Sequence, residues 1–172
     1  VPRNRAEFQG PSLVISAIRH QAADRLGEET TGHMQHLARK GARFDIVLLP
    51  SSPTAHGLEQ VQFQVAANKG NPSRPLNKVA SGGELARISL ALQVVTSQYT
   101  QTPTLIFDEV DTGIGGGVAE TVGRALRSLG RKHQVLAVTH LPQVAACGEQ
   151  HWQVRKNSEG EQTVSSIRVL SA

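Results

Sequence analysis

Apolar positions in residues 12–41 recur at intervals of three and four residues, the spacing of one helical face. Ser12 precedes the first of them and has a side chain suited to a helix N-cap. We therefore expect a long helix here, interrupted near Gly27 or Gly32, whereas residues 1–11 show no periodicity and are expected to be a disordered lead or a remnant of cloning. The apolar positions of the helix are Leu13, Ile15, Ala17, Ile18, Ala22, Leu26, Met34, Leu37 and Ala38.

Two segments with the length and apolar pattern of strands follow, at residues 42–50 and 59–68. The stretch between them, SSPTAHG at residues 51–57, has the composition of a turn. The pair therefore predicts an antiparallel two-stranded unit. Residues 69–78, KGNPSRPLNK, are expected to form a proline-rich loop.

Beyond Ser81 the pattern changes to alternating helix and strand. The strands expected at residues 104–107 and 134–140 are apolar throughout and are joined through a helix, which is typical of a parallel sheet buried on both faces. The fold class is therefore α/β, with a parallel sheet flanked by helices in a lobe of residues 42–172. The remaining expected elements are helices at residues 83–99, 117–129 and 142–147, and terminal strands at residues 151–156 and 163–170.

Polar residues follow both strands of the expected parallel sheet. Asp108 and Glu109 end the first strand, and Thr139 and His140 end the second, so all four are expected at one rim, where open parallel sheets bind ligands. An apolar strand followed by Asp-Glu is the arrangement of NTPases in which the first acid holds Mg²⁺ through water and the second polarises the attacking water. The alternative is a strand end that runs into a solvated acidic turn.

Ser81, Gly82 and Gly83 stand immediately before a strongly amphipathic helix. Glycines leave backbone N–H groups uncovered at a helix N-terminus, which makes a phosphate site. The alternative is an ordinary capping box with Ser81 as cap and Glu84 three residues later. The two interpretations are compatible.

Histidines offer further candidates. His140 at a strand end can be a structural residue, but beside the Asp108 strand end a neutral imidazole could donate a hydrogen bond to a terminal phosphate. His33 and His36 lie three residues apart on the first helix, and without a third ligand they are expected to be solvated.

A phosphate-binding loop of the form G-x-x-x-x-G-K-[ST] is missing from the sequence. The nearest match is GEETTGHM from Gly27, which has His33 where the lysine belongs and carries two glutamates that repel phosphate. The chain therefore has the water-activating and glycine-rich parts of an ATPase without the part that binds ATP.

Composition changes this picture little. The 172 residues suffice for one domain or a lobe of something larger, and the net charge of +4 is compatible with nucleic acid. An aromatic content of 3% argues against base-stacking platforms, so DNA contacts are expected to be mostly to phosphates. The single Cys147 excludes an internal disulfide. We find neither a signal peptide nor a membrane span and expect a cytoplasmic protein.

The order of the motifs LNKVASGGELARISLAL, PTLIFDEVDTGIGG and VLAVTHLPQVAA resembles the carboxyl-terminal lobe of an ABC-type P-loop NTPase head. More narrowly, DEVDTGIGGG followed by THLPQVAA resembles the RecN family of bacterial DNA repair proteins, relatives of the SMC proteins. The resemblance covers residues 44–169.

The resemblance assigns roles by position. Asp108 matches the Walker B aspartate that holds Mg²⁺, Glu109 the catalytic glutamate and His140 the switch histidine, also catalytic. Asp111 matches the D-loop acid, which is expected to contact the cofactor. Ser81, Gly82, Gly83 and Glu84 match the signature motif, which contacts the γ-phosphate of ATP on an opposing head, with glutamate in place of the transporters' glutamine.

The resemblance also implies partners. The helix over residues 12–41 matches the returning end of a coiled-coil arm, and the phosphate loop of such heads lies in an amino-terminal lobe. We therefore expect a fragment that is inactive alone, and that in the complete protein pairs through ATP and Mg²⁺ with a second head and acts on DNA at the bacterial nucleoid in double-strand break repair and recombination. A scaffold that only dimerises or binds DNA is the main alternative, and a transporter ATPase subunit is disfavoured by Glu84 and by the DTGIGG stretch.

Overall fold

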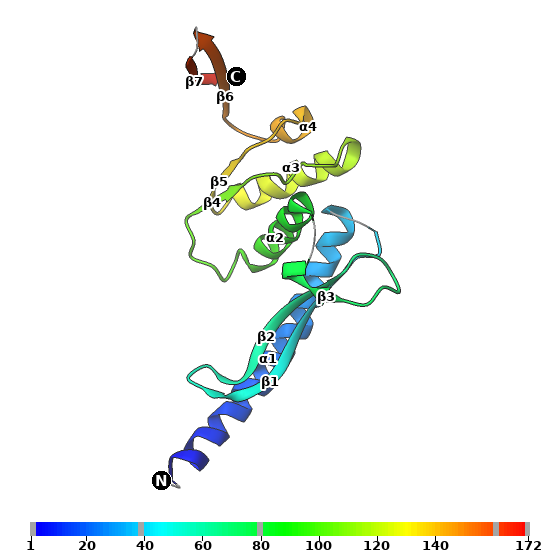
Figure 1. Ribbon diagram of the computed structural model, residues 1–172, viewed down its shortest axis with the longest axis vertical. Coiled ribbons are helices and arrows are strands. Elements are labelled where there is room, and N and C mark those ends of the chain that lie inside the picture. Colours follow the sequence, from blue (N-terminus) through cyan, green and yellow to red (C-terminus); the bar gives the residue numbers. More distant parts are fainter. Residues whose placement is uncertain (1–2, 38–39, 79–80, 160–161, 171–172) are drawn as a thin grey trace.

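The computed structural model describes residues 3–37, 40–78, 81–159 and 162–170. The molecule is elongated (Figure 1), with a long helix and a β-hairpin at one end, a helical layer against a parallel strand pair in the middle, and a separate β-ribbon at the other end. This is the expected α/β class. The buried core runs continuously from the long helix through the helical layer to the strand pair.

Helix α1 (Arg3–Leu37) is longer than the apolar pattern predicts. It begins at Arg3, so the expected disordered lead over residues 1–11 is wrong for residues 3–11; residues 1 and 2 lie outside the described part. Ser12 is therefore an interior helical residue and not a cap, and Gly27 and Gly32 do not interrupt the helix. Neither α1 nor any other helix in the described residues is long and apolar enough to cross a membrane.

Strands β1 (Arg43–Thr54) and β2 (Gly57–Ala66) form the predicted antiparallel hairpin. The ladder pairs Arg43 with Ala66 and continues to Pro50 opposite Glu59, after which its register is irregular up to the turn. Part of the stretch predicted as turn therefore belongs to β1. Within the predicted proline-rich loop lie a short third strand, β3 (Arg74–Pro75), and a 3₁₀ turn, η1 (Leu76–Lys78).

The hairpin is fastened to α1 around Phe44. The Phe44 backbone N–H donates to Thr31 Oγ1 at 2.9 Å, and the Thr31 hydroxyl lies 3.3 Å from the Phe44 carbonyl oxygen. Phe44 is 1% exposed, and its ring centroid is 5.6 Å from that of Phe63 on β2. Gly27 sits where the helix passes close to the hairpin, because a Cβ there would lie 3.3 Å from the Phe44 carbonyl oxygen.

The central part consists of α2 (Gly82–Thr96), β4 (Thr104–Phe107), α3 (Gly116–Gly130), β5 (Gln134–Ala137) and α4 (Pro142–Ala145). Strands β4 and β5 are parallel, with Thr104 opposite Gln134 and Phe107 opposite Ala137, as predicted. The predicted burial of both faces is wrong. Leu105 and Phe107 join the core with residues of α2 and α3, whereas Ile106, on the other face, is 74% exposed.

The last two strands, β6 (His151–Glu159) and β7 (Gln162–Leu170), pair as an antiparallel ribbon that stands apart from the rest (Figure 1). Residues opposite one another in such a ladder share a face. One face of the ribbon therefore carries the apolar pairs Trp152–Val169 and Val154–Ile167. These four residues are exposed.

We predict that Phe44→Ala lowers the free energy of unfolding by about 3–5 kcal/mol, because it removes a fully buried ring at the junction of α1 and the hairpin. The matched control is Phe63→Ala, which removes the same side chain from a site that is 40% exposed. Urea unfolding followed by circular dichroism measures both. An equal loss in the two variants would contradict the placement of Phe44 in the core.

Candidate functional site

The acidic residues of the turn after β4 differ in their exposure to solvent. Asp108 and Glu109 are exposed, whereas Asp111 is 1% exposed. The Asp108 carboxylate accepts the Glu109 backbone N–H at 2.8 Å, and Glu109 has a φ of 60°, in the left-handed region that a residue with a side chain rarely adopts. Such a conformation costs on the order of 1–3 kcal/mol and is concentrated at functional sites.

The helix α2 begins with a side-chain cap. Ser81 Oγ accepts the Glu84 backbone N–H at 3.4 Å, and the Ser81 carbonyl oxygen accepts the Leu85 N–H at 3.0 Å. Ser81 is therefore an N-cap, as the capping interpretation predicts. Because Ser81 and Gly82 are both exposed, the cap leaves this helix end accessible to an anion.

The two glycines let α2 approach the β4 turn closely. A Cβ on Gly82 would collide with the Glu109 carboxylate, and a Cβ on Gly83 would lie 2.9 Å from the Thr112 carbonyl oxygen. The contact at Gly83 is with backbone and does not tolerate a side chain, whereas the contact at Gly82 is with the flexible end of the Glu109 side chain. The structure therefore brings the glycine motif and the acidic strand end together within one chain.

Arg87 is a site residue that the sequence reasoning missed. It lies one helical turn after Gly83 and is 8% exposed, and its Nη1 donates to the carbonyl oxygens of Val110 at 3.3 Å and Thr112 at 2.8 Å. Arg87 thus holds the backbone on both sides of Asp111. The available signal was a charged residue among the apolar positions of α2.

Asp111 is buried, and its carboxylate is hydrogen-bonded within the chain. Its Oδ2 accepts hydrogen bonds from Thr139 Oγ1 at 2.5 Å and from the backbone N–H groups of His140 at 3.0 Å and Leu141 at 3.3 Å. Burial acts to raise the pKa of Asp111, but these hydrogen bonds outweigh it and hold the pKa below its ordinary value. The stabilisation this gives is present above the ordinary pKa and is lost as pH falls through the lowered one.

His140 lies at the rim predicted from the strand ends. The ladder between β4 and β5 continues through the Val138 N–H, which donates to the Phe107 carbonyl oxygen at 2.9 Å. His140 follows with a side chain that is 68% exposed, and its Nδ1 is 3.3 Å from Asp111 Oδ2. The predicted proximity of the two strand ends is therefore confirmed, with Asp111 as their point of contact.

The residues present suit a magnesium ion that keeps much of its water shell better than an ion bound wholly by protein ligands. Mg²⁺ keeps several waters and takes one or two carboxylates together with substrate phosphates. Asp108 presents an exposed carboxylate of that kind next to Glu109. In the described residues no group of three or more His, Cys, Asp or Glu side chains could hold a metal, and His33 and His36 are exposed, as expected.

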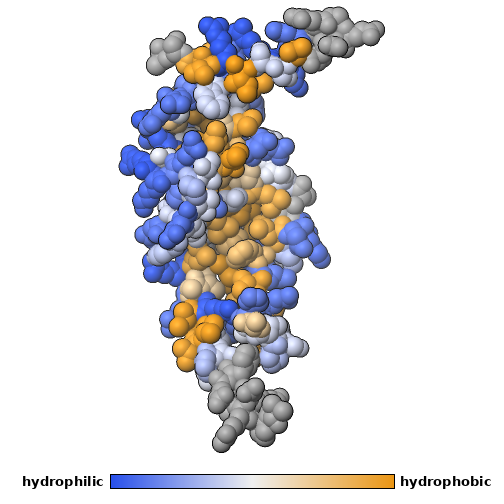
Figure 2. Space-filling view, turned by 90° about the vertical axis from the view of Figure 1, so that its left-hand side faces the viewer, coloured by the Kyte–Doolittle hydropathy of each residue, from blue (hydrophilic) through white to orange (hydrophobic). Residues whose placement is uncertain are grey.

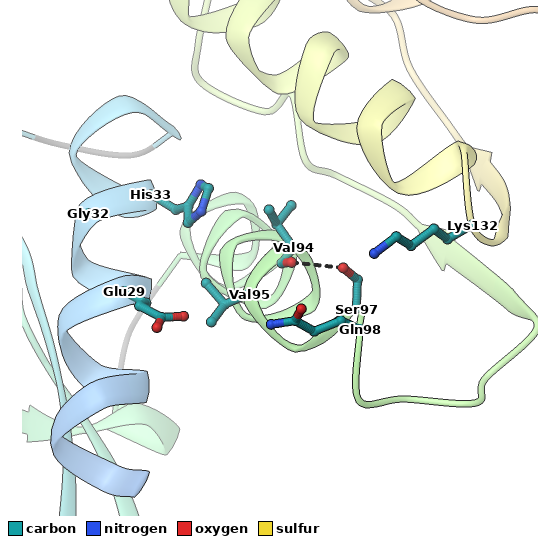
Figure 3. Close-up of a pocket in the computed structure, with 8 residues that line it drawn as sticks. All are labelled: Glu29, Gly32, His33, Val94, Val95, Ser97, Gln98 and Lys132. Atoms are coloured by element: carbon teal, nitrogen blue, oxygen red, sulfur yellow. Dashed lines mark hydrogen bonds between the residues drawn. The ribbon is translucent and has the colours of Figure 1, made fainter. Parts of the chain in front are cut away.

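A cavity of about 530 Å³ lies elsewhere, between α1, the end of α2 and Lys132 (Figure 3). It is an open hollow with two charged groups, Glu29 on α1 and Lys132 in the turn after α3. None of the predicted site residues lines it. The eight lining residues are Glu29, Gly32, His33, Val94, Val95, Ser97, Gln98 and Lys132.

Curated proteins similar to this chain are DNA repair proteins named RecN. The RecN of Xylella fastidiosa (strain Temecula1) is 47% identical over 161 residues, which cover 92% of this chain and 29% of the relative. The RecN of Haemophilus influenzae is 43% identical over 167 residues, which cover 96% of this chain and 30% of the relative. The chain thus spans about 30% of the length of these relatives. No protein-family model matches the chain.

Solved structures with a similar fold are SMC head domains. The Smc head domain with a coiled coil and joint from Pyrococcus yayanosii has a TM-score of 0.65 at 19% identity, covering 90% of this chain and 28% of that one. The Smc head domain of Pyrococcus furiosus with an extended coiled coil, bound to the C-terminal domain of ScpA, has a TM-score of 0.65 at 17% identity. The match covers 95% of this chain and 38% of that one. Identities this low show the fold alone. The fold is thus similar to part of an SMC head. Because the sequence matches RecN proteins along nearly all of its length, the chain belongs, over the segment it represents, to the RecN family.

Proposed function

We propose that this chain is the carboxyl-terminal half of an SMC-like ATPase head that acts in DNA double-strand break repair and recombination. The observation that carries the proposal is the meeting of three elements at one end of the β4–β5 pair. These are the exposed acids Asp108 and Glu109, the capped glycine helix end at Ser81, and the switch position His140. A solvated acidic turn accounts for none of these close contacts.

Bound Mg²⁺–ATP would supply the phosphoryl group and a divalent positive charge. In this proposal Asp108 holds the metal ion through its water shell, with one carboxylate oxygen already fixed by the Glu109 N–H. Glu109 polarises the attacking water from an exposed position, where its carboxylate lies beside Gly82. His140 offers its imidazole to the terminal phosphate from the neighbouring strand end.

The glycine helix end serves an opposing head. Ser81, Gly82, Gly83 and Glu84 contact the γ-phosphate of ATP that a second copy holds, and they thereby make head pairing depend on ATP. The exposed N-terminus of α2 supports this role, because a helix N-terminus with uncovered N–H groups attracts phosphate. The D-loop acid Asp111 belongs to the same nucleotide site in this proposal, and its Oδ2 is hydrogen-bonded inside the chain.

An amino-terminal lobe supplies the missing phosphate loop. Three apolar surfaces support its presence: the outer face of the strand pair at Ile106 and Val138, the apolar face of the β6–β7 ribbon, and the exposed apolar residues of α1, which suit the second helix of a coiled-coil arm. Apolar side chains gather over the middle of one face of the molecule and again near both ends (Figure 2). The exposed apolar residues of α1 are Leu13, Val14, Ile15 and Ile18.

DNA is the proposed macromolecular partner, contacted through its phosphates. The net charge of +4 and the names of the relatives support this assignment. A scaffold that only dimerises or binds DNA is the alternative. It gives no reason for a water-polarising carboxylate packed against a capped glycine helix end, so the ATPase is favoured.

The proposal is tested by supplying the missing lobe. We predict that the chain alone hydrolyses no ATP and binds it weakly, because no lysine-bearing phosphate loop is present in its sequence. Mixing it with the separately produced amino-terminal lobe of the same protein is expected to restore Mg²⁺-dependent turnover. Phosphate release measures turnover and calorimetry measures affinity. Absence of turnover in the mixture, with the two lobes shown to associate, would favour the scaffold.

A paired substitution in the complete protein tests the separate roles of the two acids. Glu109→Gln is expected to keep ATP and Mg²⁺ binding and to lower single-turnover hydrolysis by about 10²–10⁴-fold, the usual contribution of general-base catalysis, so that ATP-bound head pairs accumulate. Asp108→Asn is expected to weaken both nucleotide affinity and turnover, with partial recovery at high Mg²⁺. Equal loss of binding in both variants would contradict the division of roles.

A further inference from the structure

Four potential donors from the segment after β5 converge on one oxygen of a buried carboxylate. Asp111 Oδ2 accepts hydrogen bonds from Thr139 Oγ1 at 2.5 Å, His140 N at 3.0 Å and Leu141 N at 3.3 Å, and the Nδ1 atom of His140 lies 3.3 Å away. Backbone N–H groups and a hydroxyl arranged in this way bind an anion. The segment 139–141 is therefore folded around Asp111.

The backbone on either side of Asp111 is held by hydrogen bonds from α2. Arg87 Nη1 donates to the carbonyl oxygens of Val110 and Thr112, the residues immediately before and after Asp111. The backbone of residue 111 is consequently anchored to α2. Because this backbone is anchored, the hydrogen bonds to the Asp111 side chain give residues 139–141 a defined position relative to the turn after β4.

His140 is the residue whose function this arrangement affects most. Its side chain is 68% exposed, so little packing fixes the ring, yet Asp111 contacts it both at its backbone N–H and near its ring Nδ1. With Nδ1 turned toward the carboxylate, the opposite nitrogen, Nε2, is left for another partner. A third group that orients a histidine in this way recurs in enzyme sites.

We propose that Asp111 is a positioning residue that fixes the ring and backbone of His140 so that Nε2 is presented at the rim beside Asp108 and Glu109. Thr139 contributes by donating a hydrogen bond from its hydroxyl to Asp111. The hydrogen bonds from Arg87 to residues 110 and 112 fix the backbone from which the Asp111 side chain extends. The catalytic part of this inference rests on the proposed ATPase function. Its structural part, the ordering of residues 139–141 by Asp111, does not.

The first test uses no nucleotide. Hydrogen–deuterium exchange of the complete protein, read by mass spectrometry over residues 138–143, is compared between the unchanged protein and Asp111→Ala. Loss of a charged hydrogen-bond acceptor is expected to speed exchange at the amides of His140 and Leu141 by about ten- to a hundredfold. Unchanged exchange in a folded Asp111→Ala protein would overturn the proposal.

A matched pair at Thr139 covers the case in which Asp111→Ala does not fold. Thr139→Val removes the hydroxyl that donates to Asp111 while keeping the shape, and Thr139→Ser keeps a hydroxyl. Faster exchange at the His140 amide, which donates to Asp111 Oδ2, is expected in Thr139→Val and not in Thr139→Ser. The Leu141 amide also donates to Thr139 Oγ1 itself at 3.2 Å, so its exchange does not separate the two contacts. If the two variants exchange alike, the contact with Asp111 does not order the segment.

The second test separates positioning from general stability. Asp111→Asn is expected to lower kcat for ATP by about 10²-fold with little change in KM, since misplacement of a catalytic group costs roughly that much. In a protein that already carries His140→Ala, the same substitution is expected to have almost no further effect on kcat. Additive losses would overturn the proposal. If the unchanged protein hydrolyses no ATP, the ATPase function fails while the exchange measurements still decide whether Asp111 orders His140.

Discussion

The close approach of α2 to the turn after β4 is the constraint on which the site depends. It requires a residue without a side chain at Gly83, beside the Thr112 carbonyl group, and Gly82 leaves room for the Glu109 carboxylate. Arg87, one turn further along α2, holds the same turn by two hydrogen bonds to its backbone. A helix end and a strand end that are far apart in the sequence thereby become one rigid surface.

The turn also distributes charge in a way that a regular strand end cannot. The backbone at Glu109 is left-handed, and within this turn Asp108 and Glu109 face solvent whereas Asp111 is buried. Burying Asp111 is tolerable only because Thr139 and two backbone N–H groups replace the lost water. The strand end and the segment after β5 therefore stabilise each other.

The periodicity of the sequence was sufficient to predict the hairpin, the parallel strand pair and the proximity of the two strand ends, because these depend on local pattern and on the geometry of parallel sheets. The burial of Asp111 was not predictable from pattern, since its donors come from a segment nearly 30 residues later. The exposure of Ile106 was missed because an apolar strand reads the same whether its outer face is covered within the chain or by another segment. The start of α1 was missed because residues 3–11 have no apolar stripe to detect.

The attachment of α1 has a mechanical consequence. The helix has 35 residues, about 50 Å at 1.5 Å per residue. Contacts tie it to the hairpin along much of its length, from Thr31 with Phe44 back to Arg19 and Ser16 with Glu59, so helix and hairpin tilt as one unit. A long unit that pivots near the carboxyl end of α1 amplifies small rotations, so a tilt of about five degrees there moves the other end by about 4 Å. Small adjustments of the helical layer against which α1 packs are thus converted into much larger displacements at its far end.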